Sequence, residues 1–362
     1  MVIKGDLLCG MAVSHLSGRS RRSLHTRKGV AALGIGTFGC RILSNLAKRR
    51  LPIDSYNYIS CDKNDLENGT DGNKLHIDLK VGGKISPAYV RGAATKYTKH
   101  LEKLLHGNEV VFIFSGLGGT TGSALSPLIA EMAHQMDIGC FAVASMPFAF
   151  EKSKHFNSGV ALKRLRKHSD GIIIIDNDEL LDSAPQAPIL ESYNLITKSI
   201  GLALSKLLGS DDGMGVSLDA GKLIQMIKND GYSILGISNS SSTHNRSEES
   251  VKRALKSLSK TADPASAQEA ILFIAGDKNI SPSDLSSSIN TVEGVLGKGL
   301  NTMEYGFSSQ GNSTTTAIIL ASGFQSTKFD NYDPLGIILS GSEIDDMPDT
   351  SLDLEMNLTR LD

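Results

Sequence analysis

The feature that most constrains the fold is a regular alternation of apolar strands and amphipathic helices, which begins at residue 29 and continues to residue 178. Runs such as "GVAALGIG", "EVVFIFSG" and "GIIIID" have the length of buried strands, and the segments between them space their apolar residues as helices do. Strands joined by helices pair in parallel, so this order predicts an α/β fold with a doubly wound, mostly parallel sheet. Sheets of this kind bind ligands beyond the carboxyl ends of their strands.

Changes of pattern divide the chain into five parts. The doubly wound domain spans 29–187, a long central helix is expected at 188–209, and a smaller α/β domain of mixed strand direction follows at 210–326. The segment 1–28 is basic and has no sustained period, so we expect a flexible N-terminal arm. Residues 327–362 have the composition of an acidic tail that ends in a short leucine-rich motif.

Composition excludes several classes of protein. A formal net charge of −2 argues against a general polyanion binder, so no nucleic-acid partner is expected. The 4 cysteines form no CxxC pair and no zinc spacing, which favours free thiols in a reducing compartment over disulfides or a metal site. No apolar run approaches the roughly 20 residues that a transmembrane helix needs. We therefore expect a cytoplasmic protein that contacts membranes only indirectly or through its basic arm.

Glycine-rich and polar turns follow the strands. "GIGTFG" follows the first strand and "GLGGTTGS" follows "EVVFIFS", with "CDKND", "VGGKISP" and "PFAFEKSKH" at the other connections. A glycine-rich turn that opens a helix aims backbone N–H groups at phosphate, so these turns together indicate a nucleotide site. "GIGTFG" alone also fits a dinucleotide fingerprint with Asp54 or Asp62 as its acid, and an NAD-dependent enzyme is therefore one alternative. That alternative leaves the second turn, at 116–122, unexplained.

Several motifs occur in a familiar order. These are "GIGTFGCR", "GGKISP", "GGTTGSA" and the long stretch "MPFAFEKSKHFNSGVALKRLRKHSDGIIIIDNDELL". On these motifs the chain resembles the tubulin and FtsZ superfamily of GTP-binding filament proteins over residues 30–323. Its irregular loops are more similar to divergent archaeal homologues such as the CetZ group than to standard FtsZ.

The resemblance implies a site for GTP or GDP, with Mg²⁺ expected on the phosphates and no metal ligand assigned. The groups that would surround the phosphates are Gly36, Thr37, Gly39, Gly82, Gly83, Gly118, Gly119, Thr120, Thr121, Gly122 and Ser123. Those implied near ribose and base are Glu151, Asn177, Tyr193 and Asn194. Arg41 replaces an FtsZ asparagine near the base, where its guanidinium would either contact phosphate or stack on a ring, and His155 replaces a family arginine. Structural explanations stay open for three of them: a helix cap for Asn177, a core position for Tyr193 and a solvated helix start for Glu151.

The resemblance also implies hydrolysis between subunits, where a loop with the FtsZ pattern NxDxxD meets the next subunit's nucleotide. The stretch "VSLDAGKLI" places Ser217, Asp219 and Lys222 in those positions, so one carboxylate has become an ammonium. Asp219 is then the remaining catalytic acid, and Lys222 either stabilises phosphate charge or pairs with Asp219. Asp211 and Asp212 are candidate substitutes for the missing acid. We expect a GTPase with slow or partner-dependent turnover.

The expected function is assembly of head-to-tail filaments in cell division or cell shape, at the division site or elsewhere in the cytoplasm. The expected partners are further copies of the chain, and a standard FtsZ or other division proteins recruited through the tails. A GTP-binding regulatory module that does not polymerise is the second alternative, beside the NAD-dependent enzyme.

Overall fold

The computed structural model describes residues 29–49, 51–67, 69, 72–80, 85–181, 188–209, 214–216, 218, 220–229, 231–241, 246–276, 280–309 and 314–333. The strands are β1 (Gly29–Ile35), β2 (Ser55–Ser60), β3 (Asn73–His76), β4 (Asn108–Gly116), β5 (Gly139–Met146), β6 (Gly171–Asp176), β7 (Met214–Val216), β8 (Tyr232–Ser240), β9 (Glu269–Gly276), β10 (Thr302–Ser309) and β11 (Thr315–Phe324). The α-helices are α2 (Gly36–Ala47), α3 (Lys63–Glu67), α4 (Pro87–Ala94), α5 (Thr98–Leu105), α6 (Thr120–Gln135), α7 (Lys152–His168), α8 (Asn177–Leu181), α9 (Ile189–Leu207), α10 (Ala220–Ile227), α11 (Arg246–Thr261) and α12 (Pro282–Leu296). Short 3₁₀ helices are η1 (Thr95–Tyr97), η2 (Pro264–Ser266), η3 (Gly297–Gly299) and η4 (Lys328–Tyr332).

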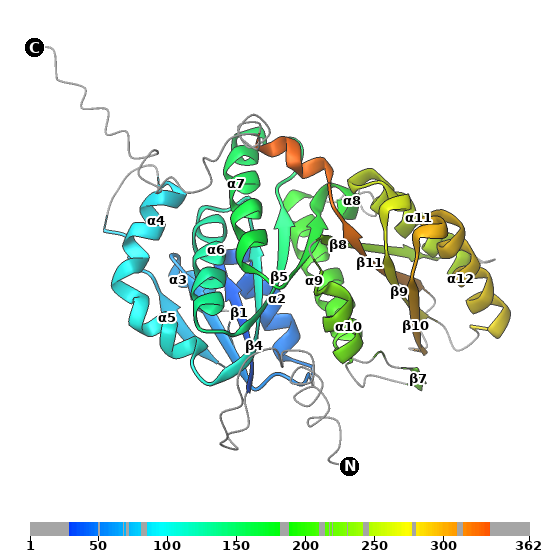
Figure 1. Ribbon diagram of the computed structural model, residues 1–362, viewed down its shortest axis with the longest axis horizontal. Coiled ribbons are helices and arrows are strands. Elements are labelled where there is room, and N and C mark those ends of the chain that lie inside the picture. The colour runs from blue at the N-terminus through cyan, green and yellow to red at the C-terminus, as the bar shows by residue number, and fades with distance from the viewer. Residues whose placement is uncertain are drawn as a thin grey trace, which may run out of the picture.

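One 11-stranded sheet, in the order β3-β2-β1-β4-β5-β6-β8-β11-β9-β10-β7, runs through the molecule (Figure 1). From β3 to β8 every neighbouring pair is parallel. Strand β11 is antiparallel to β8 and β9, and β7 is antiparallel to β10. The predicted fold class is confirmed, with one addition. Strand β6 pairs with β8, so the part of the chain that holds β1 to β6 and the part that holds β7 to β11 share one sheet. The backbone N–H and C=O groups of β6 are therefore not exposed at a sheet edge.

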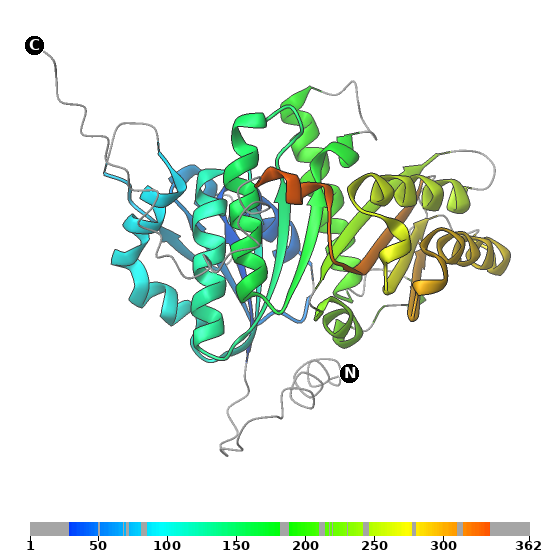
Figure 2. The ribbon, with the colours of Figure 1, turned by 45° about the horizontal axis from the view of Figure 1, so that its top comes forward.

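Both faces of the sheet are covered by helices (Figures 1 and 2). All residues of β6 are buried, with Ile172 and Ile174 in one hydrophobic cluster and Ile173 and Ile175 in the other. The first cluster takes in side chains of α4 to α7, α11 and α12, and the second those of α2, α9 and α10. Strands buried on both faces explain why the sequence shows continuous apolar runs instead of an alternation with polar residues.

Two local features depart from a plain alternation of strands and helices. The amphipathic segment 87–105 starts as a helix at Pro87, where the Ser86 Oγ accepts a hydrogen bond from the Tyr89 N at 3.2 Å, but it is broken into α4, η1 and α5. Strands β3 and β7 were not predicted, since runs of 4 and 3 residues give too short a pattern to read.

The described chain ends beside α7 and not in a free tail. Residues 327–333, assigned to the tail from the sequence, include η4, which crosses from β11 to α7 (Figures 1 and 2). The side chain of Phe329 is only 1% exposed, so this segment is part of the folded body. The predicted arm at 1–28 and the rest of the tail lie outside the described residues. Among the helices that are described, none combines the length and apolarity needed to cross a membrane.

Candidate functional site

A cavity of about 550 Å³ lies at the carboxyl ends of β1, β2, β4, β5 and β6, where a doubly wound sheet binds its ligands. The connections that follow these strands supply most of its wall, and the connection after β3 and helix α9 supply the rest. The predicted residues that line it are Gly36, Thr37, Arg41, Gly118, Gly119, Thr120, Thr121, Gly122, Glu151, Asn177 and Tyr193. Residues far apart in the sequence are thus brought together around one space.

One side of the cavity is formed by the N-termini of α2 and α6. The N-cap positions are Ile35 and Gly119, neither helix start has a side-chain cap, and neither first turn carries an acid. The first N–H groups of a helix have no partner within the helix, and the helix dipole makes this end positive. Two uncapped helix starts at one cavity favour an anion such as phosphate.

Carboxylates lie on the same side. The Oδ2 of Asp65 accepts hydrogen bonds from the Ser60 Oγ at 2.6 Å and the Thr37 Oγ1 at 3.1 Å, and Asp62 also lines the cavity. Within the described residues no group of three or more His, Cys, Asp or Glu side chains is placed to hold a metal alone. Mg²⁺ commonly takes one or two carboxylates together with phosphate oxygens and water. The residues present therefore fit a magnesium ion that is bound together with a phosphate ligand.

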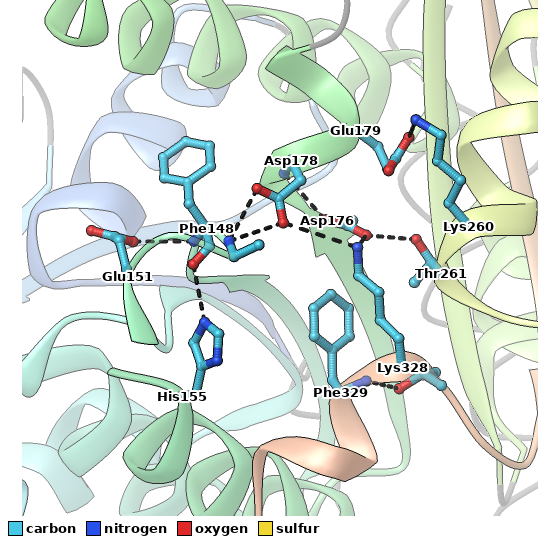
Figure 3. A network of polar contacts seen from close by, with 12 residues as sticks. Phe148, Glu151, His155, Asp176, Asp178, Glu179, Lys260, Thr261, Lys328 and Phe329 are labelled. Carbon is cyan, nitrogen blue, oxygen red and sulfur yellow. Dashed lines mark hydrogen bonds and ion pairs between the residues drawn. The ribbon is translucent and has the colours of Figure 1, made fainter. Parts of the chain in front are cut away.

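The connections after β5 and β6, together with α9, carry groups suited to a sugar and a base. The carboxylate of Glu151 accepts a hydrogen bond from the Phe148 N at 3.1 Å (Figure 3). It also pairs with Lys154, another lining residue. The Asn177 Oδ1 accepts a hydrogen bond from the Ser145 Oγ at 2.7 Å. Burial raises the pKa of Tyr193, and the neighbouring Glu151 carboxylate raises it further. Tyr193 therefore presents a protonated hydroxyl at neutral pH.

Two predicted phosphate contacts have other roles in the structure. A Cβ on Gly39 would lie 2.0 Å from the Phe114 O, so this glycine is required where α2 packs on β4. The Ser123 Oγ donates to the Gly119 O at 2.9 Å, which uses its hydroxyl within α6. Neither residue lines the cavity. Close packing of α2 on β4 accounts for Gly39, and a hydrogen bond within α6 accounts for the Ser123 hydroxyl.

Two further predicted nucleotide-binding residues, His155 and Asn194, also lie away from the cavity. The His155 ring stacks on Tyr332, with centroids 3.8 Å apart, and its Nε2 lies 3.1 Å from the Phe148 O. Asn194 is exposed, whereas Thr197 lines the cavity with Tyr193. Residues four apart share a helix face, and that spacing would have pointed to Thr197.

Of the three residues predicted for hydrolysis, the structure describes one, Lys222. Ser217 and Asp219, the candidate substitutes Asp211 and Asp212, and the predicted phosphate contacts Gly82 and Gly83 lie outside the described residues. Lys222 is described, and its Nζ lies 2.7 Å from the Glu304 Oε1. A pairing with β10 was not predicted for this lysine.

Two observations bear on the dinucleotide alternative. The Asp54 Oδ2 accepts from the Val30 N at 2.8 Å, at the start of β1, which is the opposite end of the sheet from the cavity. Of the two acids considered for a ribose contact, only Asp62 lines the cavity.

Sequence reasoning missed part of the wall. Asp62 was considered only for the dinucleotide alternative, and the other lining residues that were not predicted are Ile35, Phe38, Cys61, Asp65, Leu79, Ile85, Gly116, Ser145, Met146, Pro147, Lys154 and Thr197. Asp62 and Asp65 stand in "CDKND", directly after a predicted strand, and that position is a usable signal for a site residue.

The comparisons with known proteins agree with this geometry. The Tubulin/FtsZ family, GTPase domain, matches residues 29–185. Cell division protein FtsZ 1 of Pyrococcus abyssi is 30% identical over 254 residues, which cover 68% of this chain and 68% of the relative. A solved FtsZ mutant from M. jannaschii has a TM-score of 0.71 at 24% identity, covering 84% of this chain and 94% of that chain. The GTPγS-bound protofilament of CetZ2 from Haloferax volcanii has a TM-score of 0.68 at 19% identity, covering 87% of this chain and 100% of that one. The chain therefore belongs to the tubulin/FtsZ family, as a divergent member similar to FtsZ and CetZ.

Proposed function

We propose that this protein binds GTP and GDP in the cavity and assembles head to tail into filaments that serve cell division or cell shape. The observation that carries the binding part is the uncapped N-terminus of α6 at a cavity that also holds Asn177 and Glu151. A nucleotide matches this arrangement, since it presents phosphate at one end and a sugar and base at the other.

Each wall of the cavity has a role in this proposal. The helix starts at Gly36 and Thr120 bind the phosphates through backbone N–H groups, while Glu151 accepts from ribose hydroxyls. Asn177 reads the guanine edge, and Tyr193 packs beside the base. Asp62 and Asp65 would hold Mg²⁺ with the phosphates, where it supplies charge neutralisation when bound.

Nucleotide binding is tested by Thr121→Arg. Its side chain would enter the wall at the first turn of α6 and fill the space meant for phosphate. We expect loss of at least about 100-fold in affinity for fluorescent GTP, because a blocked phosphate site removes several strong hydrogen bonds at once. The matched control is Thr98→Arg, at an exposed position of α5. Unchanged affinity in Thr121→Arg would contradict this placement of the phosphates.

Assembly is supported by the relatives and by the surface beside the cavity. The CetZ2 structure is a protofilament, and the Pyrococcus relative is a cell division protein. Phe150 is 63% exposed directly before α7, and Ile85, a lining residue, is 40% exposed. Burial of such side chains by the next subunit would favour a repeated head-to-tail contact, which makes a filament when it does not close.

Hydrolysis is proposed to be slow or to depend on a partner. Lys222 stands where a carboxylate is expected, and an ammonium cannot accept a proton from water. Asp219 remains as the proposed catalytic acid in the contact between subunits. Brisk turnover by the protein alone, unchanged in Asp219→Ala, would contradict this assignment.

A further inference from the structure

Residues 327–333, called the clasp below, cross from the end of β11 to α7. A capping box closes the turn, with the Phe329 N donating to the Thr327 Oγ1 and the Thr327 N to the Asp330 carboxylate. The approach to α7 is close, since a Cβ on Gly159 would lie 2.8 Å from the Asp333 N. This segment is therefore built to rest on α7.

The clasp brings a cation to the residues that flank Asn177. Asp176 ends β6 with only 3% of its side chain exposed, and it accepts from the Thr261 Oγ1 at 2.7 Å and pairs with Lys328 (Figure 3). The Lys328 Nζ also lies 4.0 Å from the Asp178 Oδ2. A buried carboxylate is tolerated when it is paired and hydrogen-bonded, so Lys328 and Thr261 account for the burial of Asp176.

Asp178 in turn holds the loop between β5 and α7. Its Oδ1 and Oδ2 each accept from the Ala149 N at 3.1 Å (Figure 3). Burial raises the pKa of Asp178 and the Asp176 charge raises it further, while the Ala149 N–H and Lys328 lower it. The loop carries Pro147 and Glu151 to the cavity wall, so Asp178 links Lys328 to the proposed ribose contact.

The same loop is held from a second direction. The His155 Nε2 lies 3.1 Å from the Phe148 O, and the His155 ring lies flat against Tyr332 with 4° between the planes. Burial raises the pKa of Tyr332 to about 12, with contributions from Asp178 and Asp176, so the ring stays neutral. The clasp thus contacts both residues that hold the loop, because Lys328 lies beside Asp178 and Tyr332 stacks on His155.

We propose that the clasp is a positioning element of the nucleotide site, in which Lys328 and Tyr332 act through Asp178 and His155 to set the loop that carries Glu151 and to hold the neighbourhood of Asn177. This inference rests on the proposed binding of a nucleotide in the cavity. It assigns His155 a role that differs from direct nucleotide contact.

The test uses the full chain and two matched pairs of variants. Lys328→Met removes the charge, while Lys328→Arg keeps it. Gly159→Ala places a methyl group against the clasp, whereas Gly92→Ala adds one on α4 where nothing lies within 4 Å. Hydrogen exchange is measured across 147–151 without nucleotide, followed by the affinities for GTP and ATP.

We expect Lys328→Met and Gly159→Ala to speed hydrogen exchange at the Phe148 and Ala149 amides. GTP affinity should fall by about tenfold, the size of effect typical when one interaction in a hydrogen-bond and ion-pair network is lost. Their preference for GTP over ATP falls, a change that a purely structural role would not produce. Lys328→Arg and Gly92→Ala behave as the wild type. Should Lys328→Met fail to fold, Asp176→Asn with Lys328→Met removes both charges of this ion pair, so no buried carboxylate is left unpaired, and the double variant is expected to give the same fast exchange.

Folded Lys328→Met and Gly159→Ala proteins with wild-type exchange and wild-type affinity would overturn the proposal. A wild-type chain that binds no nucleotide would instead refute the proposed function. The exchange comparison is made without nucleotide, so it still decides whether the clasp holds the loop.

Discussion

The hydroxyl of Ser145 donates a hydrogen bond to Asn177, the proposed base contact, and fixes the direction of its carboxamide in the cavity. In Ser145→Ala the carboxamide is free to turn, and we expect GTP affinity to fall about fivefold, the effect of roughly one hydrogen bond. Titration calorimetry with GTP measures this change. Ser126→Ala is the matched control, because the Ser126 Oγ is buried on α6 without a hydrogen-bond partner. Equal affinities for both variants would contradict a role of Ser145 in base binding.

The thiols offer a second test at this scale. Burial raises the pKa values of Cys40 and Cys140 to about 12. Burial also raises the pKa of Cys61, while a hydrogen bond with Thr121 lowers it and the Asp65 charge raises it. A raised pKa leaves less thiolate at a given pH, so alkylation of Cys61 should be slow at pH 7 and speed up as the pH rises. Cys61 lines the cavity, so saturating GTP should protect it.

Mass spectrometry after N-ethylmaleimide treatment reads out this prediction in a Cys9→Ser background. The internal controls are Cys40 and Cys140, which are buried and should stay unmodified with and without GTP. Alkylation of Cys61 at the same rate with and without GTP would place the nucleotide elsewhere.

Residues of the site were predictable where a sequence motif fixes the backbone conformation. They were less predictable where tertiary packing decides which face of a helix lines the cavity. Gly118 and Thr121 follow β4 in a glycine-rich turn, and they line the cavity as that pattern predicts. Thr197 and Asp65 were missed, because their place on the wall depends on how α9 and α3 sit against the sheet. His155 was placed by analogy with an arginine, and its stacking on Tyr332 depends on a segment distant in sequence.

Among the elements, α10 carries the most direct prediction about hydrolysis. Lys222 lies in its first turn and pairs with Glu304 of β10. Lys222→Asp restores a carboxylate at the position where the family pattern has one, and we expect GTP turnover to rise by about tenfold or more, since orienting the attacking water is worth orders of magnitude. Lys222→Ala is the control, because it removes the ammonium without adding a carboxylate. Phosphate release at fixed protein concentration is the measurement, and equal turnover in both variants would contradict the assignment.

Whole elements were predicted well when their periodicity was long. The central helix was expected at 188–209, and α9 spans Ile189–Leu207. The clasp could not be predicted, because η4 has 5 residues and is held by Phe329, Lys328 and the approach to Gly159, none of which leaves a periodic pattern. Tertiary contacts therefore decide the elements that the sequence leaves undefined.

At the scale of the molecule, one sheet joins the nucleotide-binding half to the second half through the pairing of β6 with β8. Asn177 directly follows β6, so the proposed base contact lies at the junction of the two halves. The ion pair of Lys260 with Glu179, at 2.8 Å, and the contacts of Lys328 cross the same junction. The proposed base contact is thus joined to the second half by strand pairing and by two ion pairs.

The central claim is that subunits bind GTP and complete one another's sites in a filament, and GTP turnover measured against protein concentration tests it most directly. We expect turnover per subunit to be low and to rise above a threshold concentration at which GTP-dependent pelleting also begins, with a further increase when a standard FtsZ is added. Thr121→Arg should show neither threshold. Tight GTP binding by a protein that stays monomeric at every concentration, with turnover per subunit that never changes, would contradict the account and leave a GTP-binding regulatory module in its place.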